Sequence, residues 1–264
     1  MKNDDIVITS AFRTAIGKFS GSLSSQTAPE LGSTVIKKCV ENSELKKEEV
    51  DMVYMGQVLT AGTGQNPARQ ASILAGLPHE TTNTTVNQVC GSGLASVALA
   101  YNSIKSGDGK LVIAGGQESM SNSPHYMNIR KGIKMGDGKM KDSMIIDGLW
   151  DVYNQYHMGI TAENVAEKFQ IRREEQDSFA AASQRKAAEA IKEKKFVNEI
   201  VPVKIKFKKE EIEFDKDEYP KAESTVEKLA KLRPAFKKDG TVTAGNASGV
   251  NDGAAAVCLM TGEM

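Results

Sequence analysis

The sequence predicts an α/β fold in which a β-sheet is covered by helices on both faces. Three observations carry this prediction. Over residues 1–115, short β-branched segments alternate with segments of helical periodicity. Asn-Pro, Gly-Leu-Pro and Gly-Ser-Gly sequences, which favour caps and turns, separate these segments. One helical segment has a nearly all-apolar first half, which is typical of a buried helix.

The first two predicted elements are a strand and a helix. Asp5–Ser10 (DIVITS) has the composition of a short strand. Pro29–Asn42 predicts a helix because Leu31, Val35 and Cys39 recur every four residues and form one apolar stripe.

A second strand and helix follow. Asp51–Leu59 (DMVYMGQVL) predicts the strand. Asn66 and Pro67 open the helix, because Asn is a favourable N-cap and Pro fits the first helical turn. This helix runs through Ile73 and ends near Gly76.

A third strand and helix precede a fourth strand. Thr84–Val89 is rich in β-branched residues and predicts a strand. Leu94–Lys105 (LASVALAYNSIK) predicts the buried helix, and Lys110–Gly115 the last strand of this part. The order of elements indicates a layered fold.

The chain changes character after this point. Six of the 11 Met lie between Met120 and Met158, and a charged stretch follows. It contains a long amphipathic helix over 172–195 and a hairpin over 201–207 and 211–215. Residues 241–261 return to core-like sequence, first as a loop and then as a buried strand. We interpret 120–247 as an insertion that covers the core, and assign 1–119 with 248–264 to the core.

Composition excludes several classes of protein. The 264 residues carry 34 basic and 34 acidic side chains, which disfavours a nucleic-acid-binding role. No apolar run reaches the roughly 18 residues of a membrane span, and the first residues lack signal-peptide features, so we expect a cytoplasmic protein. Three Cys without a CxxC pattern and three His predict neither a disulfide framework nor a zinc site.

Cys90 is the strongest chemical signal. The order strand, Cys, Gly-Ser-Gly, helix resembles a nucleophile elbow. The positive end of a helix favours the thiolate, which can attack an acyl carbonyl. The local pattern also fits a small buried residue in a tight turn. Cys39 and Cys258 lie on apolar segments and are predicted core residues.

The segment VNQVCGSGLAS around Cys90 resembles the acyl-enzyme signature of the thiolase family. Other segments resemble thiolase sequences in the same order along the whole chain: RTAIGKFSGSL, GQNPARQ, AGGQESMS, HMGITAEN, KLRPAF and TAGNASGVNDGAAA. The resemblance implies the N-terminal half of a thiolase-like layered fold with an inserted loop domain at 120–247.

The resemblance also implies roles for single residues. Cys90 stands where the family forms its acyl-thioester, and Ser248 where a serine meets the pantetheine arm of coenzyme A. His157 and Met158 match residues that line the acyl and pantetheine pocket, although His157 by itself also fits a hydrogen-bonded packing role. This His-Met pair resembles short-chain, biosynthetic-type thiolases.

Three further positions depart from the family or match it less closely. Ala244 and Phe236 match additional pocket positions. Lys221 stands where relatives often place an Arg near the adenine of coenzyme A; Lys keeps the charge but lacks the planar stacking surface.

The resemblance places the family's activating His, an Asn-bound water and a second Cys in a second, similar half. No His follows His157 and no Cys follows Cys258 in this sequence. We therefore expect the C-terminal half to be absent and this chain alone to lack the acid–base residues. A fragment, a split product or a partner that supplies the rest would each explain this.

The function implied is that of an acetyl-CoA C-acetyltransferase, which condenses two acetyl-CoA to acetoacetyl-CoA or cleaves the product in reverse. The coenzyme A thioester is the substrate, and no metal or other cofactor is expected. The full enzyme is expected to be a homo-oligomer, a dimer or a tetramer. Two alternatives stay open: a ketoacyl-synthase-like enzyme and a non-catalytic acyl-CoA-binding module.

Overall fold

The computed structural model describes residues 5–43, 45–207 and 210–264. The chain divides into two compact units. The first comprises Met1–Ser143, Glu199–Glu218 and Asn251–Met264, and the second comprises Met144–Asn198 and Tyr219–Val250.

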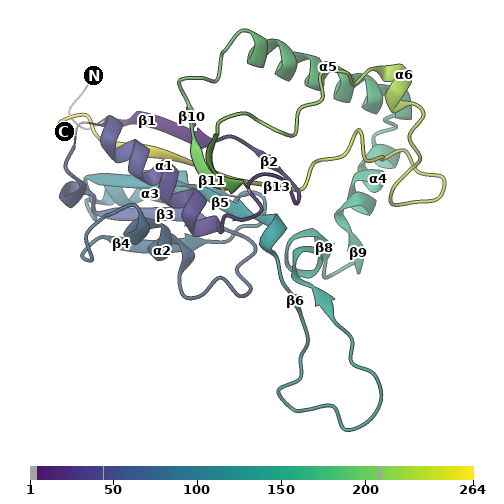
Figure 1. Ribbon diagram of the computed structural model, residues 1–264, viewed down its shortest axis with the longest axis horizontal. Helices are drawn as coiled ribbons and strands as arrows, with labels where there is room; N and C mark the ends of the chain where they lie inside the picture. The colour runs from purple at the N-terminus through teal and green to yellow at the C-terminus, as the bar shows by residue number, and fades with distance from the viewer. Residues whose placement is uncertain (1–4, 44, 208–209) are drawn as a thin grey trace. The chain divides into compact units, whose positions relative to one another are not determined.

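A seven-stranded mixed sheet forms the centre of the first unit (Figure 1). Its order is β10-β1-β13-β5-β3-β4, with β2 paired to β13. Strand β13 runs antiparallel to both β1 and β5, whereas β5, β3 and β4 are mutually parallel. The strands are β1 (Ile6–Thr14), β2 (Gly17–Lys18), β3 (Met52–Gly56), β4 (Thr82–Val86), β5 (Leu111–Ser119), β10 (Ile200–Val201) and β13 (Asn251–Thr261).

Helices cover both faces of this sheet, as the sequence predicts. Helices α1 (Ala28–Asn42) and α2 (Pro67–Leu74) contribute to one apolar cluster, which includes Ile113 of β5. Helix α3 (Ser92–Ser106) contributes Ala100 and Ile104 to a second cluster with Val112 and Ala114 of the same strand. Successive side chains of β5 therefore point to opposite faces.

The helix starts follow from local chemistry. Thr27 caps α1, and the Thr27 backbone N–H donates a hydrogen bond to the Glu30 carboxylate, which completes a capping box. The predicted N-cap of α2 is confirmed: the Asn66 side chain accepts a hydrogen bond from Arg69 N at 3.2 Å.

The prediction that α3 is buried through its apolar first half is wrong for one side of the helix. Leu94 and Leu99 are 78% and 41% exposed, and the buried side carries small residues, among them Ser92, Ser96 and Ala100. Small side chains allow this side of the helix to lie close to the sheet, whereas Leu94 and Leu99 lie on the exposed side.

The second unit is mostly helical. Its elements are a π-helix (Met144–Leu149), β8 (Trp150–Asp151), β9 (Tyr156–His157), α4 (Met158–Lys168), α5 (Arg173–Lys192) and α6 (Val226–Leu229). The sequence predicted α5 but not α4. The first unit also contains the short pair β6 (His125–Tyr126) and β7 (Lys141–Asp142), and 3₁₀ turns at Lys47–Glu49 and Met120–Asn122.

The predicted hairpin is present as β11 (Val203–Phe207) and β12 (Glu210–Phe214); its predicted turn falls on residues outside those described. Val203, Ile205 and Phe214 are buried in the same cluster as α1. Two parts of the predicted insertion, Met120–Ser143 and Glu199–Glu218, thus belong to the first compact unit, and the predicted domain boundaries stay a prediction. That 120–247 covers a coenzyme A site stays a prediction.

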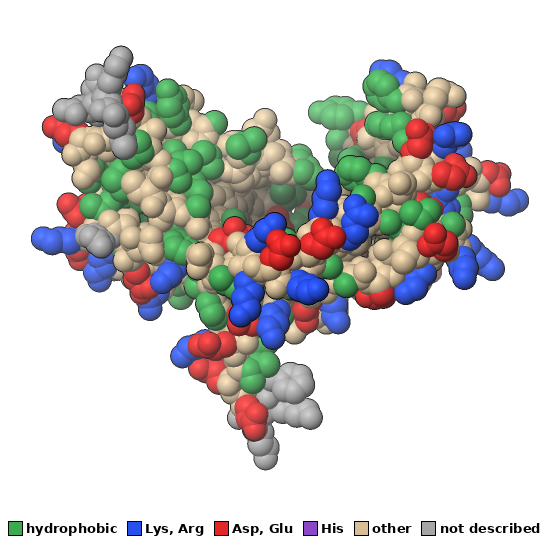
Figure 2. Space-filling view, turned by 90° about the horizontal axis from the view of Figure 1, so that it is seen from above, with side chains coloured by type: hydrophobic (Ala, Val, Ile, Leu, Met, Phe, Trp, Pro, Cys, Tyr) green, Lys and Arg blue, Asp and Glu red, His purple; other side chains and the backbone are tan. Residues whose placement is uncertain are grey.

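Within the described residues, no helix combines the length and apolar character needed to cross a membrane. Basic and acidic side chains are interleaved over the face displayed in Figure 2. This agrees with the balanced charge of the sequence.

The hairpin supplies a test of its place in the core. Ile205 and Ile212 lie directly opposite each other, but Ile205 is buried and Ile212 is 39% exposed. Replacement of Ile205 by Ala should lower the free energy of unfolding by about 2–4 kcal/mol. Ile212→Ala, the matched control, should lower it by about 1 kcal/mol or less. Chemical denaturation measures both; equal small effects would place the hairpin outside the core.

Candidate active site

Cys90 lies in the turn between β4 and α3. Gly91 N donates to Gln88 O at 3.1 Å and Ser92 N donates to Val89 O at 3.0 Å, so the chain reverses sharply around the cysteine. Cys90 is exposed. The predicted order of strand, cysteine and helix is present, and β4 ends at Val86 because the turn occupies the residues that the sequence assigned to the strand.

Two side chains fix the conformation of this turn. The Ser92 hydroxyl accepts a hydrogen bond from Gln88 N at 2.8 Å and donates one to Val89 O at 2.6 Å. The Asn87 side chain accepts from Val89 N at 2.9 Å. Val89 has a φ of 50°, a left-handed conformation that is unfavourable for a β-branched residue. Such strain persists only where neighbouring contacts impose it, and it clusters at functional sites.

The start of α3 rests on the end of β3 at Gly56. A Cβ atom on residue 56 would lie 2.6 Å from the Ser92 carbonyl carbon and 2.7 Å from Gly93 N. Only glycine permits this approach. The N-terminus of α3 therefore lies at the carboxyl ends of the parallel strands, where its N–H groups and partial positive charge favour an anion.

Glu118 lies near the end of β5 and was not singled out from the sequence. Its carboxylate accepts hydrogen bonds from Val58 N at 2.8 Å and Leu59 N at 3.3 Å. Burial raises the pKa of this carboxyl, against the lowering effect of these donors and with a further rise from Asp252. The sequence feature that points to Glu118 is an acidic residue near the carboxyl end of a buried strand. Its contacts show that it holds the chain leaving β3.

The other two cysteines are core residues, as predicted. Cys39 and Cys258 are buried in the cluster between α1 and the sheet. Burial raises the pKa of the Cys39 thiol to about 12 and also raises that of Cys258. Both thiols therefore stay protonated near neutral pH, and solvent does not reach them.

The predicted substrate-binding residues all belong to the second unit, and the structure brings two of them into direct contact. The rings of His157 and Phe236 stack at a centroid distance of 4.9 Å and an angle of 18°. His157 Nδ1 accepts a hydrogen bond from Gly159 N at 3.0 Å and so caps α4. A Cβ atom on Gly159 would overlap the Phe236 ring, so glycine is required there.

The other four predicted substrate-binding residues lie elsewhere in the second unit. Met158, the first residue of α4, is 37% exposed. Ala244 and Ser248 are exposed in the loop that precedes β13, and the Lys221 backbone N donates to Gln184 of α5 at 2.8 Å. Among the described residues, no hydrogen bond, ion pair or ring contact joins these last three to the His157–Phe236 pair.

No cluster of three or more His, Cys, Asp or Glu residues in the described part of the chain could hold a metal ion. The candidate nucleophile of the site is the exposed Cys90 thiol beside the N-terminus of α3.

A family model described as "Thiolase, N-terminal domain" matches residues 6–263. The chain belongs to the thiolase family. It is 57% identical over 259 residues to an acetyl-CoA acetyltransferase of Pseudomonas aeruginosa and 58% identical over 259 residues to one of Cupriavidus necator. Each comparison covers 97% of this chain and 66% of the relative, so the chain spans a little under two thirds of their length.

A solved structure gives the same result for the fold of this thiolase. The Bacillus anthracis acetyl-CoA acetyltransferase matches with a TM-score of 0.95 and 41% identity. The match covers 98% of this chain and 66% of that one. The predicted family resemblance and the mixed α/β thiolase fold are thereby confirmed.

The three thiols should differ sharply in reactivity. Stoichiometric iodoacetamide at neutral pH, followed by peptide mapping, should label Cys90 first, because it is exposed beside a helix N-terminus. Cys39 and Cys258 should react only after unfolding. Labelling of either buried thiol as fast as Cys90 in the folded thiolase would contradict this account of the site.

Proposed function

We propose that this thiolase acts as an acetyl-CoA C-acetyltransferase in which Cys90 carries the acetyl group. The observation that carries the proposal is the exposed Cys90 in a strained turn at the N-terminus of α3. The acetyl-CoA acetyltransferases to which the chain is more than half identical support the choice of substrate.

The first step is transfer of the acetyl group to the enzyme. The Cys90 thiolate attacks the thioester carbonyl of acetyl-CoA, and a tetrahedral oxyanion forms. Collapse of this intermediate breaks the bond between the carbonyl carbon and the coenzyme A sulfur. Coenzyme A leaves as a thiolate and takes up a proton, and Cys90 is left as an acetyl-thioester. Backbone N–H groups at a helix N-terminus suit the negative charge that develops.

The second step joins two acetyl units. A base that we assign to no residue of this chain removes an α-proton from a second acetyl-CoA, the carbanion attacks the acetyl-thioester, and acetoacetyl-CoA is released with the Cys90 thiolate restored. Thiolysis is the reverse. We do not assign the base to His157, because its Nδ1 already accepts the Gly159 N–H and its ring stacks on Phe236. This geometry favours a role for His157 in lining the substrate pocket.

We further propose that coenzyme A is bound by residues of the second unit. Ser248 would contact the pantetheine arm, Lys221 the nucleotide end, and His157, Met158, Phe236 and Ala244 the walls of the pocket. Within the proposal, 120–247 covers this site, no metal or other cofactor takes part, and neither nucleic acid nor a membrane is a partner. A cytoplasmic location and a dimeric or tetrameric homo-oligomer belong to the same proposal.

Mass spectrometry after incubation with acetyl-CoA tests the proposal. One acetyl group should appear on the peptide that contains Cys90, because the acetyl-thioester of Cys90 is the product of the proposed first step. Cys90→Ser, which keeps the size of the side chain but lacks the thiolate, should stay unmodified.

Other outcomes would change the conclusion. Binding of coenzyme A without acetylation would favour the non-catalytic binding module. Acetyl transfer only from an acyl carrier protein would favour the ketoacyl-synthase alternative. Acetylation of a different residue in the folded protein would remove Cys90 from its assigned role.

A further inference from the structure

Two buried carboxylates hold the loop that precedes β13. The loop Thr241–Asn246 contains Ala244 and leads to Ser248. Glu163 of α4 and Asp177 of α5 are 5% and 1% exposed, respectively. Both lie within the second unit, and both bind this loop.

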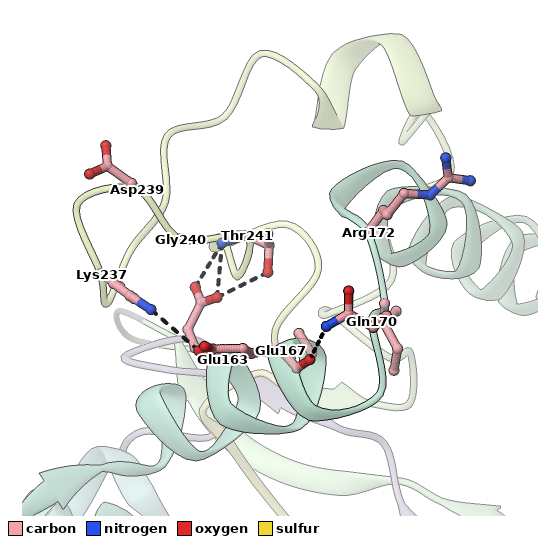
Figure 3. A pocket seen from close by; sticks show the side chains of 10 residues that line it. Glu163, Glu167, Gln170, Arg172, Lys237, Asp239, Gly240 and Thr241 are labelled. Carbon is pink, nitrogen blue, oxygen red and sulfur yellow. Dashed lines mark hydrogen bonds and ion pairs between the residues drawn. The ribbon is translucent and has the colours of Figure 1, made fainter.

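Glu163 accepts the hydrogen bonds of the backbone N–H groups at the start of the loop. Its carboxylate accepts hydrogen bonds from Thr241 N at 2.8 and 2.9 Å, from Val242 N at 2.8 Å and from the Thr241 hydroxyl at 3.0 Å. Figure 3 shows the carboxylate pointing from α4 toward Gly240 and Thr241. Two backbone donors of the loop thus depend on one side chain.

Gly240 of the loop lies directly against the Glu163 carboxylate, and both residues line the pocket of Figure 3. A Cβ atom on Gly240 would lie 2.2 Å from Glu163 Oε1. The loop backbone therefore passes directly over the carboxylate, and a side chain at 240 would force the carboxylate or the loop to shift. Such a shift would disturb this contact without removing the charge of Glu163.

Asp177 secures the other end of the loop through Asn246. The Asn246 amide donates to Asp177 Oδ1 at 2.9 Å and to Thr241 O at 3.1 Å, and its oxygen accepts from Thr243 N at 2.7 Å. Arg173 binds the second oxygen of Asp177 at 2.7 Å. The loop is thus closed on itself and anchored to both helices.

The hydrogen bonds from the loop stabilise the negative charge of Glu163. Burial by itself would raise the pKa of its carboxyl, but the donors on Val242 and Thr241, with the charge of Lys237, lower the pKa below its ordinary value. The side chain is therefore ionised at neutral pH. A buried carboxylate is tolerated only when it is fully hydrogen-bonded, so the loop and the charge stabilise each other.

We propose that Glu163 is a positioning residue for coenzyme A, because it fixes the loop Thr241–Asn246 to the helix that begins with Met158. This inference rests on the proposed function, in which His157, Met158, Ala244 and Ser248 bind the thioester. Glu163 joins the two segments that carry these residues into one rigid surface. It does not touch the substrate itself.

The consequence is a selective effect on binding. Loss of the carboxylate leaves the Thr241 and Val242 N–H groups poorly paired, so the loop loses its fixed position while α4 and α5 remain. Coenzyme A should bind more weakly. The reactivity of Cys90, which is set by β4 and α3 in the first unit, should not change.

The test compares Glu163→Gln with Glu167→Gln. Glu167 lies one turn later on α4, is exposed, and makes an ion pair with Lys237 at 3.7 Å, so it loses the same charge without affecting the loop. Isothermal titration calorimetry with coenzyme A should give a Kd raised about tenfold for E163Q, the size expected from a poorly paired buried group. E167Q should change the Kd by less than about twofold, as for other exposed ion pairs.

Two additional measurements separate positioning from a general loss of structure. Iodoacetamide labelling of Cys90 should proceed at the same rate in E163Q and the unsubstituted chain. Gly240→Ala, which keeps the charge of Glu163 but disturbs its contact with the loop, should also weaken coenzyme A binding. This second variant carries the test if E163Q does not fold.

The outcomes are distinguishable. If the unsubstituted, folded chain does not bind coenzyme A, the proposed function fails and this inference with it. If the unsubstituted chain binds and E163Q binds equally well, the inference alone is overturned. A tenfold loss that is accompanied by an equal change in Cys90 labelling would show a general structural role and would also overturn it.

Discussion

The close approach of Gly56 to the start of α3 is the contact on which the candidate active site depends. A Cβ at residue 56 would collide with the backbone of Ser92 and Gly93, so the helix can begin at the sheet edge only because residue 56 has no side chain. This position lets the Ser92 hydroxyl close the turn between Gln88 and Val89. Cys90 is therefore presented at a helix N-terminus, whereas Cys39 and Cys258 are buried in the core.

Outside the sheet, several carboxylates fix the conformation of loops by accepting hydrogen bonds from loop residues. Glu118 binds the segment after β3, and Glu163 binds the loop at 241–242. Asp217 makes a bidentate pair with Arg13 at 2.7 and 3.0 Å and also accepts Ile16 N. Backbone N–H groups in loops have no ladder partner, and a charged acceptor satisfies several of them at once. Irregular segments can then be as well defined as the elements they join.

The sequence predicted the features that depend on local chemistry. Periodicity located α1, the Asn66-Pro67 pair located α2, and the apolar context of Cys39 and Cys258 placed both in the core. It did not predict β10, because a two-residue strand forms only through its non-local pairing with β1.

Several features in and around the predicted site residues could not be predicted from the sequence, each for a physical reason. Helix α4 was missed because His157 caps it through Nδ1, in place of the Ser, Thr, Asp or Asn that usually marks a helix start. The left-handed Val89 could not be foreseen, since a β-branched residue adopts that conformation only when side chains such as Ser92 and Asn87 impose it. The roles of Glu118 and Glu163 required the loop geometry, because an isolated Glu in a sequence does not reveal which backbone groups it will bind.

We propose that the turn imposed by Ser92 and Asn87, and not the cysteine alone, makes Cys90 an acyl acceptor. The rate of Cys90 acetylation by acetyl-CoA in Ser92→Ala tests it most directly, with Ser96→Ala as the control. Ser96 is also buried and donates to Ser92 O at 3.0 Å within α3, but among the described residues its hydroxyl makes no hydrogen bond to Gln88, Val89 or Cys90. Loss of the Ser92 hydroxyl should slow acetylation about tenfold or more, because the strained turn relaxes, while S96A should retain the original rate. Equal rates in S92A and the unsubstituted chain would contradict the account.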